Sequence, residues 1–377
     1  MYVSSVAFLV LGLLTGDVFG SEIPKLALGK QKGRQLKSAK ADKMDKVSKK
    51  GKSSKSPSFS SAVFTMTNAP TGNGIIMFTR DEETGILTLA PASPFDTGGV
   101  GGDAALDPNT NDPLASQGPL IVSGSCLLAA NAGSNTVSTF QILSDRIELV
   151  SIVGSGGEIP VSIASNGSGL VYVLNAGLAG SISGFNLDQE TCAMSSIDDS
   201  TVSLKLTPLA DEMVPDTPFF VSSPVQIEFT PSGAQLIVVI KGIRGNPFVG
   251  GTINRYAVDG ESGLVSNPNV HEIGADALIP FGFDFDGAGN LLLVDVFGTG
   301  PFGDLEASES TLISFDVEST NTTRGARVGL GTNIGCWVQY NSVDGCVFTA
   351  NTGPNSISSV QVQNGNLTLI ESVAANV

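Results

Sequence analysis

Short apolar runs separated by turn residues recur along the chain, and residues 117–142 show the pattern most clearly. Three runs lie there, each five to seven residues long and bounded by Gly, Asn or Ser: Gly118-Pro-Leu-Ile-Val122, Cys126-Leu-Leu-Ala-Ala130 and residues 136–142. Short runs of β-formers between turn residues are typical of antiparallel strands joined by tight turns. The segment therefore predicts three successive antiparallel strands.

The same unit returns further along the chain. The second run ends in Asn followed by a Gly-containing turn at three places: Asn131, Asn175 and Asn351. Two more units carry a tight Gly turn between their first two runs, at residues 230–233 and 286–290. Self-similar units of four short strands are the sequence signature of propeller blades. We therefore predict an all-β fold, a β-propeller of four-stranded antiparallel blades.

Counting strands gives about six blade units, so a seventh is missing or incomplete. The first unit has runs at residues 63–68, 74–79 and 87–90, but no inner strand precedes them. Residues 366–374 read as the outer strand of the sixth unit, which leaves no strand to complete the first. We expect a gap or strained seam between the first and last units. An open sheet edge of this kind lowers stability or pairs with another molecule.

The region before the first blade divides into two segments. Residues 1–20 contain the apolar stretch 6–14, too short to span a bilayer, followed by small residues, and read as a signal peptide. Residues 21–60 contain few large apolar side chains and predict a disordered, Lys/Ser-rich basic arm. Residues 61–377 form the predicted propeller. We expect a secreted protein without a membrane span; a bipartite plastid signal is the less favoured alternative.

Charge is divided unequally between arm and propeller. Residues 25–55 hold 12 Lys or Arg and two Asp, whereas the chain from Ser56 onward holds eight basic and 32 acidic residues. An acidic domain repels phosphates, which argues against nucleic acid as its partner. The arm is either a solvated linker or propeptide, or a tail that binds polyanionic surfaces.

Four cysteines and three glycosylation motifs fit a secreted protein. Cys336 and Cys346 flank a predicted hairpin turn and are our candidates for a disulfide, with Cys126 and Cys192 as buried thiols. The Asn-X-Ser/Thr motifs lie in predicted turns and predict glycosylation at Asn166, Asn321 and Asn366.

Strand alternation places one set of loops on a single face of the predicted propeller. The turns between second and third strands share that face with the connections between blades, including the long insertions at residues 242–251 and 298–310. Loops gathered at one end of a rigid scaffold often carry the binding site. The candidate binding residues near this mouth are Lys241, Arg244, Gln117, Gln226, Asn131, Asn175, Asn351 and Trp337.

Several of these candidates have two interpretations. Lys241 and Arg244 could hold a carboxylate or phosphate, or could balance charge within a loop. The three Asn side chains could bind a ligand or stabilise their turns, and Trp337 could stack on a ligand or pack between blades. Asp295 or Asp284 could act as a general base, because a desolvated carboxylate acquires a raised pKa. No spacing supports a metal site, and we expect no cofactor.

The units resemble the lactonase-type seven-bladed propeller family, which includes 6-phosphogluconolactonase and carboxymuconate cyclase. The resemblance covers residues 61–377. It depends on the repeated Asn-Ala-Gly turn together with Ser116-Gln-Gly, Ser223-Pro-Val-Gln226, Pro280-Phe-Gly-Phe283 and Gly335-Cys-Trp-Val338. It implies hydrolysis or isomerisation of a small lactone in the central channel, with His, Arg and acidic residues at the channel mouth.

The chain departs from that family pattern at histidine. Its single histidine, His271, falls in a predicted outer strand or connector. A Ser-His-Asp triad is therefore not expected, and no family catalytic residue matches this sequence residue by residue. Two functions stay open: a secreted enzyme acting on a small anionic lactone, and a non-catalytic extracellular propeller that binds a glycan or a matrix component.

Overall fold

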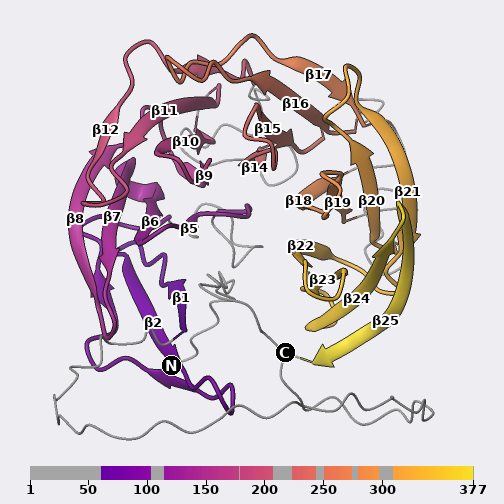
Figure 1. Cartoon of the computed structure of the whole chain (residues 1–377), viewed down its shortest axis with the longest axis horizontal. Helices are drawn as coiled ribbons and strands as arrows, with labels where there is room; N and C mark the ends of the chain where they lie inside the picture. The colour runs from indigo at the N-terminus through magenta and orange to yellow at the C-terminus, as the bar shows by residue number, and fades with distance from the viewer. Residues whose placement is uncertain are drawn as a thin grey trace, which may run out of the picture.

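The protein folds into sheets arranged around a central axis (Figure 1). The structure is a computed structural model that describes residues 61–102, 114–177, 179–206, 223–242, 250–273, 279–296 and 309–376. Within these ranges the chain forms six antiparallel sheets, each built from strands consecutive in sequence. This confirms the predicted all-β propeller of six blade units.

Five blades, numbered 2 to 6, run outward from an innermost strand in chain order. Blade 2 contains β5 (Leu120–Ser123), β6 (Cys126–Asn131), β7 (Thr136–Ile142) and β8 (Ile147–Gly154). Blade 3 contains β9 (Pro160–Ser165), β10 (Leu170–Asn175), β11 (Ser181–Leu187) and an outer edge split into β12 (Met194–Ser196) and β13 (Val202–Ser203).

Blades 4 to 6 have four strands each. Blade 4 contains β14 (Pro224–Phe229), β15 (Gln235–Ile240), β16 (Thr252–Ala257) and β17 (Asn269–Glu272). Blade 5 contains β18 (Pro280–Phe285), β19 (Leu291–Asp295), β20 (Thr311–Asp316) and β21 (Thr323–Gly329). Blade 6 contains β22 (Gly335–Asn341), β23 (Cys346–Asn351), β24 (Ser356–Gln363) and β25 (Asn366–Asn376).

Blade 1 has four strands but only three positions across its width. β1 (Ala62–Met66) pairs with one edge of β2 (Gly74–Arg80), and β3 (Leu87–Leu89) and β4 (Phe95–Asp96) share the other edge. β3 pairs with the second half of β2, and β4 pairs with its first two residues. Within the described residues the inner edge of β1 has no strand beside it, as the strand count predicted.

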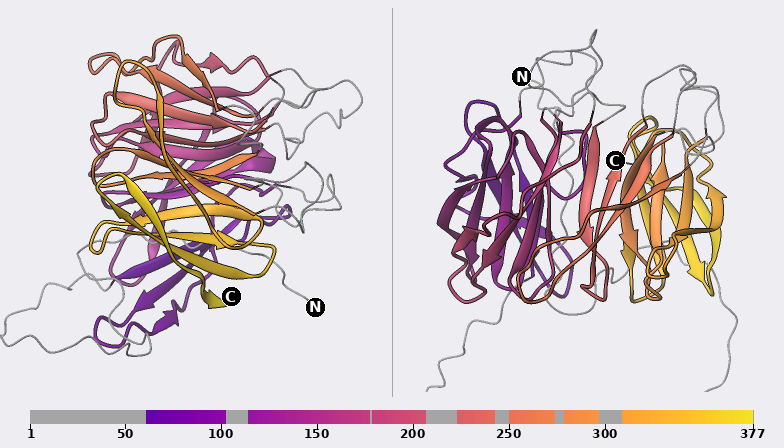
Figure 2. Two further views of the ribbon diagram at one scale, coloured as in Figure 1. Left: turned by 90° about the vertical axis from the view of Figure 1, so that its right-hand side faces the viewer. Right: turned by 90° about the horizontal axis from the view of Figure 1, so that it is seen from above.

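The strands cross the thickness of the disc, so turns of one kind gather at one end (Figure 2). We call the end that carries the turns between first and second strands the a–b end, and the other the b–c end. The a–b turn of blade 3 shows why the chain reverses there. The Asn166 Oδ1 accepts hydrogen bonds from the backbone N–H of Ser168 at 2.8 Å and of Leu170 at 3.1 Å, and Gly167 has a φ of 70°, which glycine adopts without steric cost.

The hydrophobic core lies between the blades, where the face of one sheet packs against the face of the next. Buried clusters therefore combine strands of different blades, as where Val338 and Val347 of blade 6 pack with Leu292 and Val294 of blade 5. Polar contacts reinforce this stacking. The Tyr172 hydroxyl of blade 3 donates to the Gly263 carbonyl of blade 4 at 2.8 Å.

Among the described blades, the ring is open at one place. Figure 1 shows β1–β4 and β22–β25 on opposite sides of a break, whereas every other pair of consecutive blades stacks side by side. The innermost strands β5, β9, β14, β18 and β22 face the centre.

The disulfide prediction was wrong. Cys126, the first residue of β6, is bonded to Cys192 in the turn that follows β11, with a Cα–Cα distance of 5.4 Å, so the bridge joins blades 2 and 3. Cys336 and Cys346 are not joined to each other by a disulfide. The register of the β22–β23 hairpin explains why: Cys346 lies opposite Asn341, at the turn, and Cys336 lies near the other end of the same hairpin.

Candidate functional site

A segment of the chain crosses the centre of the propeller before it enters β5. Residues 114–118, here called the plug, contact the inner strands of four blades. Leu114, Ala115 and Ser116 are buried. The Ser116 hydroxyl donates to the Val161 carbonyl of blade 3 at 2.7 Å, and the Gln117 N–H donates to the Val225 carbonyl of blade 4 at 3.0 Å.

The Gln117 side chain extends the plug to blades 5 and 6. Its Nε2 donates to the carbonyls of Phe283 at 3.2 Å and Val338 at 3.0 Å, and its Oε1 accepts from the Val338 N–H at 3.1 Å. Gln226 makes a similar pair of bonds with Phe283, donating to its carbonyl at 2.9 Å and accepting from its N–H at 2.8 Å. These two amides form a hydrogen-bonded layer across the inner strands, here called the amide layer.

Lys241 is part of the plug contact. Its side chain is fully buried, and its Nζ donates to the Ala115 carbonyl at 2.5 Å and to the Ser223 hydroxyl at 3.1 Å. The ammonium also lies 4.7 Å from the centre of the Phe281 ring, within cation–π range. The structure thus places Lys241 against backbone and ring, and Arg244 lies outside the described residues.

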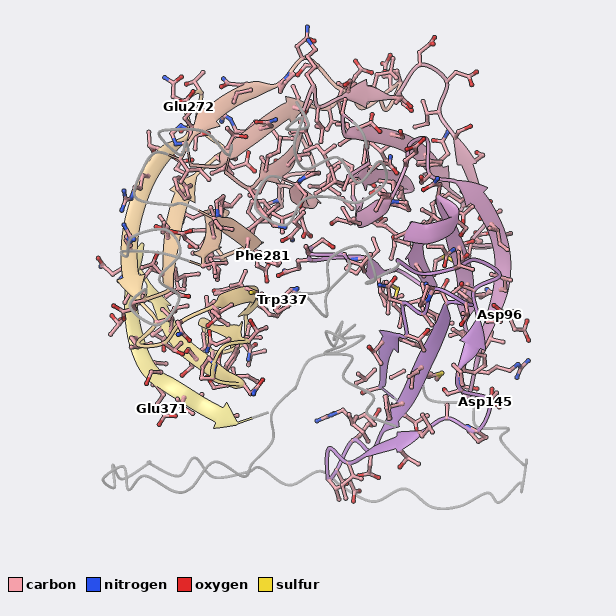
Figure 3. The ribbon with its side chains drawn as sticks, turned by 180° about the vertical axis from the view of Figure 1, so that it is seen from behind. Asp96, Asp145, Glu272, Phe281, Trp337 and Glu371 are labelled. Carbon is pink, nitrogen blue, oxygen red and sulfur yellow. A yellow bond between two sulfur atoms is a disulfide. The ribbon has the colours of Figure 1, made fainter. Side chains whose placement is uncertain are left out.

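Trp337 packs between blades and holds the plug. Its indole N–H donates to the Ser116 carbonyl at 2.9 Å, and its ring meets the Phe281 ring edge-on, with centroids 5.4 Å apart. Figure 3 shows Phe281 and Trp337 next to each other on the inner side of the ring, whereas Asp96, Asp145, Glu272 and Glu371 lie around the outside.

A polar row lies beyond the amide layer, one or two residues further along the strands toward the a–b end. Glu228, Asp284 and Gln339 occupy corresponding positions on β14, β18 and β22, the inner strands of three successive blades. All three are in partial contact with solvent, whereas Gln226, Phe283 and Val338 are buried. We call this set the carboxylate row.

Amides hold both carboxylates in place. The Glu228 Oε2 accepts from the Gln226 Nε2 at 3.0 Å. The Asp284 Oδ2 accepts from the Gln339 Nε2 at 2.7 Å and from the Tyr340 N–H at 2.6 Å, and its Oδ1 accepts from the Phe285 N–H at 2.7 Å. Asp284 therefore has more donors than Glu228, and its charged form is better stabilised.

The two carboxyl groups consequently titrate in different ranges. Burial, reinforced by the negative charge of Asp284, raises the pKa of Glu228 to about 8, against the lowering effect of the Gln226 amide. Burial raises the pKa of Asp284 only to about 6, because the Tyr340 and Phe285 N–H groups lower it. Near pH 7 Glu228 is mostly protonated and Asp284 mostly ionised. Two carboxyl groups separated in this way suit the roles of acid and base.

The sequence analysis found only part of this row. Asp284 was a candidate base and Gln226 a candidate binding residue, but Glu228 and Gln339 were missed. The signal was present, because Pro224-Val-Gln-Ile-Glu-Phe and Pro280-Phe-Gly-Phe-Asp-Phe place an acid at the same position of their strands. The row also lies toward the a–b end, not at the b–c end to which the loop lengths pointed.

The three candidate asparagines stabilise the b–c end. Asn131, Asn175 and Asn351 are buried. The Nδ2 of each donates to hydroxyls on the following strand, as where Asn351 reaches Ser358 at 2.8 Å. In blade 2 the turn itself is the 3₁₀ segment η2 (Ala132–Ser134), followed by Asn135 with a φ of 56°. The left-handed residue is thus Asn135, not Asn131.

The remaining candidates are separate from the carboxylate row. Asp295 is buried at the end of β19, where its Oδ1 accepts from the Ile279 N–H at 2.9 Å. His271 lies on outer strand β17 and packs edge-on against Phe315. Of the glycosylation candidates, Asn321 and Asn366 are exposed and Asn166 is half-buried. Among the described residues no group of three or more His, Cys, Asp or Glu is arranged to hold a metal ion.

Solved structures that align with this chain include two proteins named for lactonase activity. The periplasmic gluconolactonase of Pseudomonas aeruginosa aligns with a TM-score of 0.56 and 13% identity, over 84% of this chain and 83% of its own. A candidate 6-phosphogluconolactonase from Bacteroides uniformis aligns with a TM-score of 0.56 and 14% identity, over 82% of this chain and 81% of its own. The chain has the lactonase-type propeller fold. No family model and no curated protein matches the sequence.

This fold does not by itself select an activity. The hydrazine synthase of Kuenenia stuttgartiensis aligns with a TM-score of 0.50 and 13% identity, over 80% of this chain and 73% of its own. Proteins named for different reactions therefore share the arrangement, and the function has to be argued from the residues of this chain.

Proposed function

We propose that this propeller hydrolyses a lactone at the carboxylate row, with Asp284 as general base and Glu228 as general acid. The observation that carries the proposal is the placement of two electrostatically coupled carboxyl groups on neighbouring inner strands, both reached by solvent. The named activities of the Pseudomonas and Bacteroides propellers support a lactone as substrate class.

The proposed reaction follows from the protonation states of the pair. The Asp284 carboxylate accepts a proton from water while the water oxygen attacks the lactone carbonyl carbon. The tetrahedral intermediate then collapses, the ring C–O bond breaks, and the Glu228 carboxyl donates its proton to the departing alkoxide oxygen. The product is a hydroxy acid, and transfer of a proton from Asp284 to Glu228 through solvent restores the starting state.

Substitution of the pair tests this proposal. Glu228→Gln and Asp284→Asn in the full chain should each lower kcat/KM for lactone opening by about 10²–10⁴-fold, the usual contribution of a positioned acid or base. Acid release from a panel of lactones measures the rate. Glu261→Gln, an exposed turn residue on blade 4, is the matched control and should retain activity. Turnover that survives in both row variants would exclude the mechanism.

We also propose that the chain is exported. The Cys126–Cys192 disulfide supports an oxidising compartment, and the apolar stretch at residues 6–14 supports a signal peptide. No helix within the described residues is long and apolar enough to cross a membrane. Determining the N-terminus of the native protein tests the proposal; an intact Met1 would contradict removal of residues 1–20.

A further inference from the structure

The two ends of the propeller centre differ in their access to the carboxylate row. Toward the b–c end, the amide layer and the plug lie directly behind the row. Gln226 and Ser116 are each less than 5% exposed, as is Val338, the partner of Gln117, whereas Gln117 itself is partly exposed. Toward the a–b end, Gln339 is exposed and Tyr340 is half-buried. Solvent that contacts the two carboxyl groups therefore comes from the a–b end.

The inner strands carry no positive charge that could balance the row. β1, β5, β9, β14, β18 and β22 contain neither Lys nor Arg. Most cationic side chains of the described blades belong to β2, to turns or to the outer blade edges. The two exceptions already have partners. Arg255, on β16, donates to the carbonyls of Val317, Ser319 and Thr320, and Lys241 donates to the plug.

The consequence is a negative, one-sided site. The Lys241 ammonium lies behind the amide layer and donates to the Ala115 carbonyl, so it is not presented to a substrate that approaches Glu228 and Asp284. Among the described residues, Asp284 has no cationic partner, so an anionic substrate would meet its negative charge in a partly buried setting where charge repulsion is poorly screened.

We infer that the carboxylate row admits uncharged lactones from the a–b end and discriminates against phosphorylated or carboxylated ones. The choice of a lactone as substrate class rests on the proposed hydrolysis. The access route is inferred from the plug and the amide layer, and the negative electrostatic potential at the row is inferred from the charges on the inner strands. The inference departs from the expectation, drawn from the sequence, of a small anionic substrate held by Lys241 and Arg244.

A matched pair of substrates tests the discrimination. With the full chain at low ionic strength, glucono-1,5-lactone should be opened with a kcat/KM at least about tenfold higher than its 6-phosphate, and added salt should narrow the ratio. Equal or preferred turnover of the phosphate ester would overturn the inference while leaving the hydrolysis itself intact. If neither lactone is opened, the proposed function fails, and the following measurement still decides the access route and the charge.

Thiol labelling measures access and potential without turnover. In a Cys346→Ser background, Gln339→Cys should react about tenfold faster with a cationic methanethiosulfonate than with an anionic one of similar size. The ratio should fall toward one when Glu228→Gln and Asp284→Asn are added, whereas Gln363→Cys, exposed at the end of β24, should be insensitive to those changes. An unreactive Cys at position 339, or a ratio unaffected by the two substitutions, would refute the inference.

Discussion

Two ionisable side chains, Lys241 and Glu228, lie near the centre of the molecule in different surroundings. Lys241 is fully buried, and a carbonyl, a hydroxyl and a ring face are among its partners. Glu228 accepts a hydrogen bond from the Gln226 amide and lies near a second carboxyl group, Asp284. Lys241 therefore has a structural role, whereas burial favours the protonated form of Glu228.

The raised pKa of Glu228 makes stability depend on pH in a defined direction. Its pKa is about 8 in the folded protein against an ordinary value of 4.5, so the folded state holds the proton more tightly than the unfolded state does. The stabilisation is present below pH 4.5 and is lost as pH rises toward 8. Asp284, raised to about 6, changes stability in the same direction at lower pH.

We therefore expect Glu228→Gln to raise the free energy of unfolding at pH 9 by about 1–2 kcal/mol, and to change it little at pH 4, since one pKa unit corresponds to about 1.4 kcal/mol and partial exposure screens part of the shift. Denaturant unfolding at both pH values measures the difference. Equal effects of the substitution at pH 4 and pH 9 would show that Glu228 is not the titrating group.

The role of a residue could be predicted from the sequence where its side chain type suits few environments. It was missed where the partner is distant in the chain. Of the two interpretations of Trp337, packing between blades is the one that the structure shows, with the ring against Phe281. Lys241 was expected to hold a carboxylate or phosphate, or to balance charge within a loop, and it does neither in the contacts described above. Its partner Ala115 is 126 residues away in the sequence, so no local sequence pattern indicates that contact.

At the scale of strands and turns, the inner strands of the blades were well predicted, whereas only two outer strands, at residues 87–90 and 366–374, were recognised. Tight turns with Gly and Asn bound the inner strands closely, so their register follows from local chemistry. The outer edges of blades 1 and 3 are split into short pieces, β3 with β4 and β12 with β13. Strands of two or three residues carry too little alternation to be recognised in a sequence.

The disulfide is the covalent link between two such elements, β6 of blade 2 and the turn after β11 of blade 3. Cys126→Ala with Cys192→Ala should lower the free energy of unfolding by about 2–4 kcal/mol, because the bridge closes a loop with a sequence separation of 66 residues. Chemical denaturation under non-reducing conditions measures the loss. Cys346→Ser is the control; a loss of similar size in that variant would mean that the effect does not come from the bridge.

At the scale of the whole molecule, the plug substitutes for closure of the ring. Blades 1 and 6 lie on opposite sides of the break (Figure 1), so the ring does not support itself as a closed circle. The plug instead connects the chain leading into blade 2 with the inner strands of blades 3, 4, 5 and 6. The predicted seam is thus present, and the expectation that it lowers stability or recruits another molecule stays a prediction.

Gln117→Ala should weaken the connection between the plug and blades 5 and 6. The substitution removes three hydrogen bonds to blades 5 and 6 and leaves the Val338 N–H without its acceptor, so we expect a loss of about 2–4 kcal/mol. Urea unfolding gives the magnitude, and proteolysis followed by mass spectrometry shows whether blades 5 and 6 become cleavable first. The exposed Gln363→Ala is the control, and an unchanged midpoint in Gln117→Ala would show that the plug bears no such role.

Contacts at the centre of the propeller can fix the positions of the blades even where the ring of blades is open. Because residues 114–118 bind the inner strands of blades 3 to 6, the spacing of those blades is set from the centre and does not depend on what lies at the break between β1 and β25. A repeat added or removed at that point would leave the central contacts unchanged. The number of repeats in such an architecture can therefore vary without loss of the carboxylate row, whose residues lie on β14, β18 and β22 and none on blade 1.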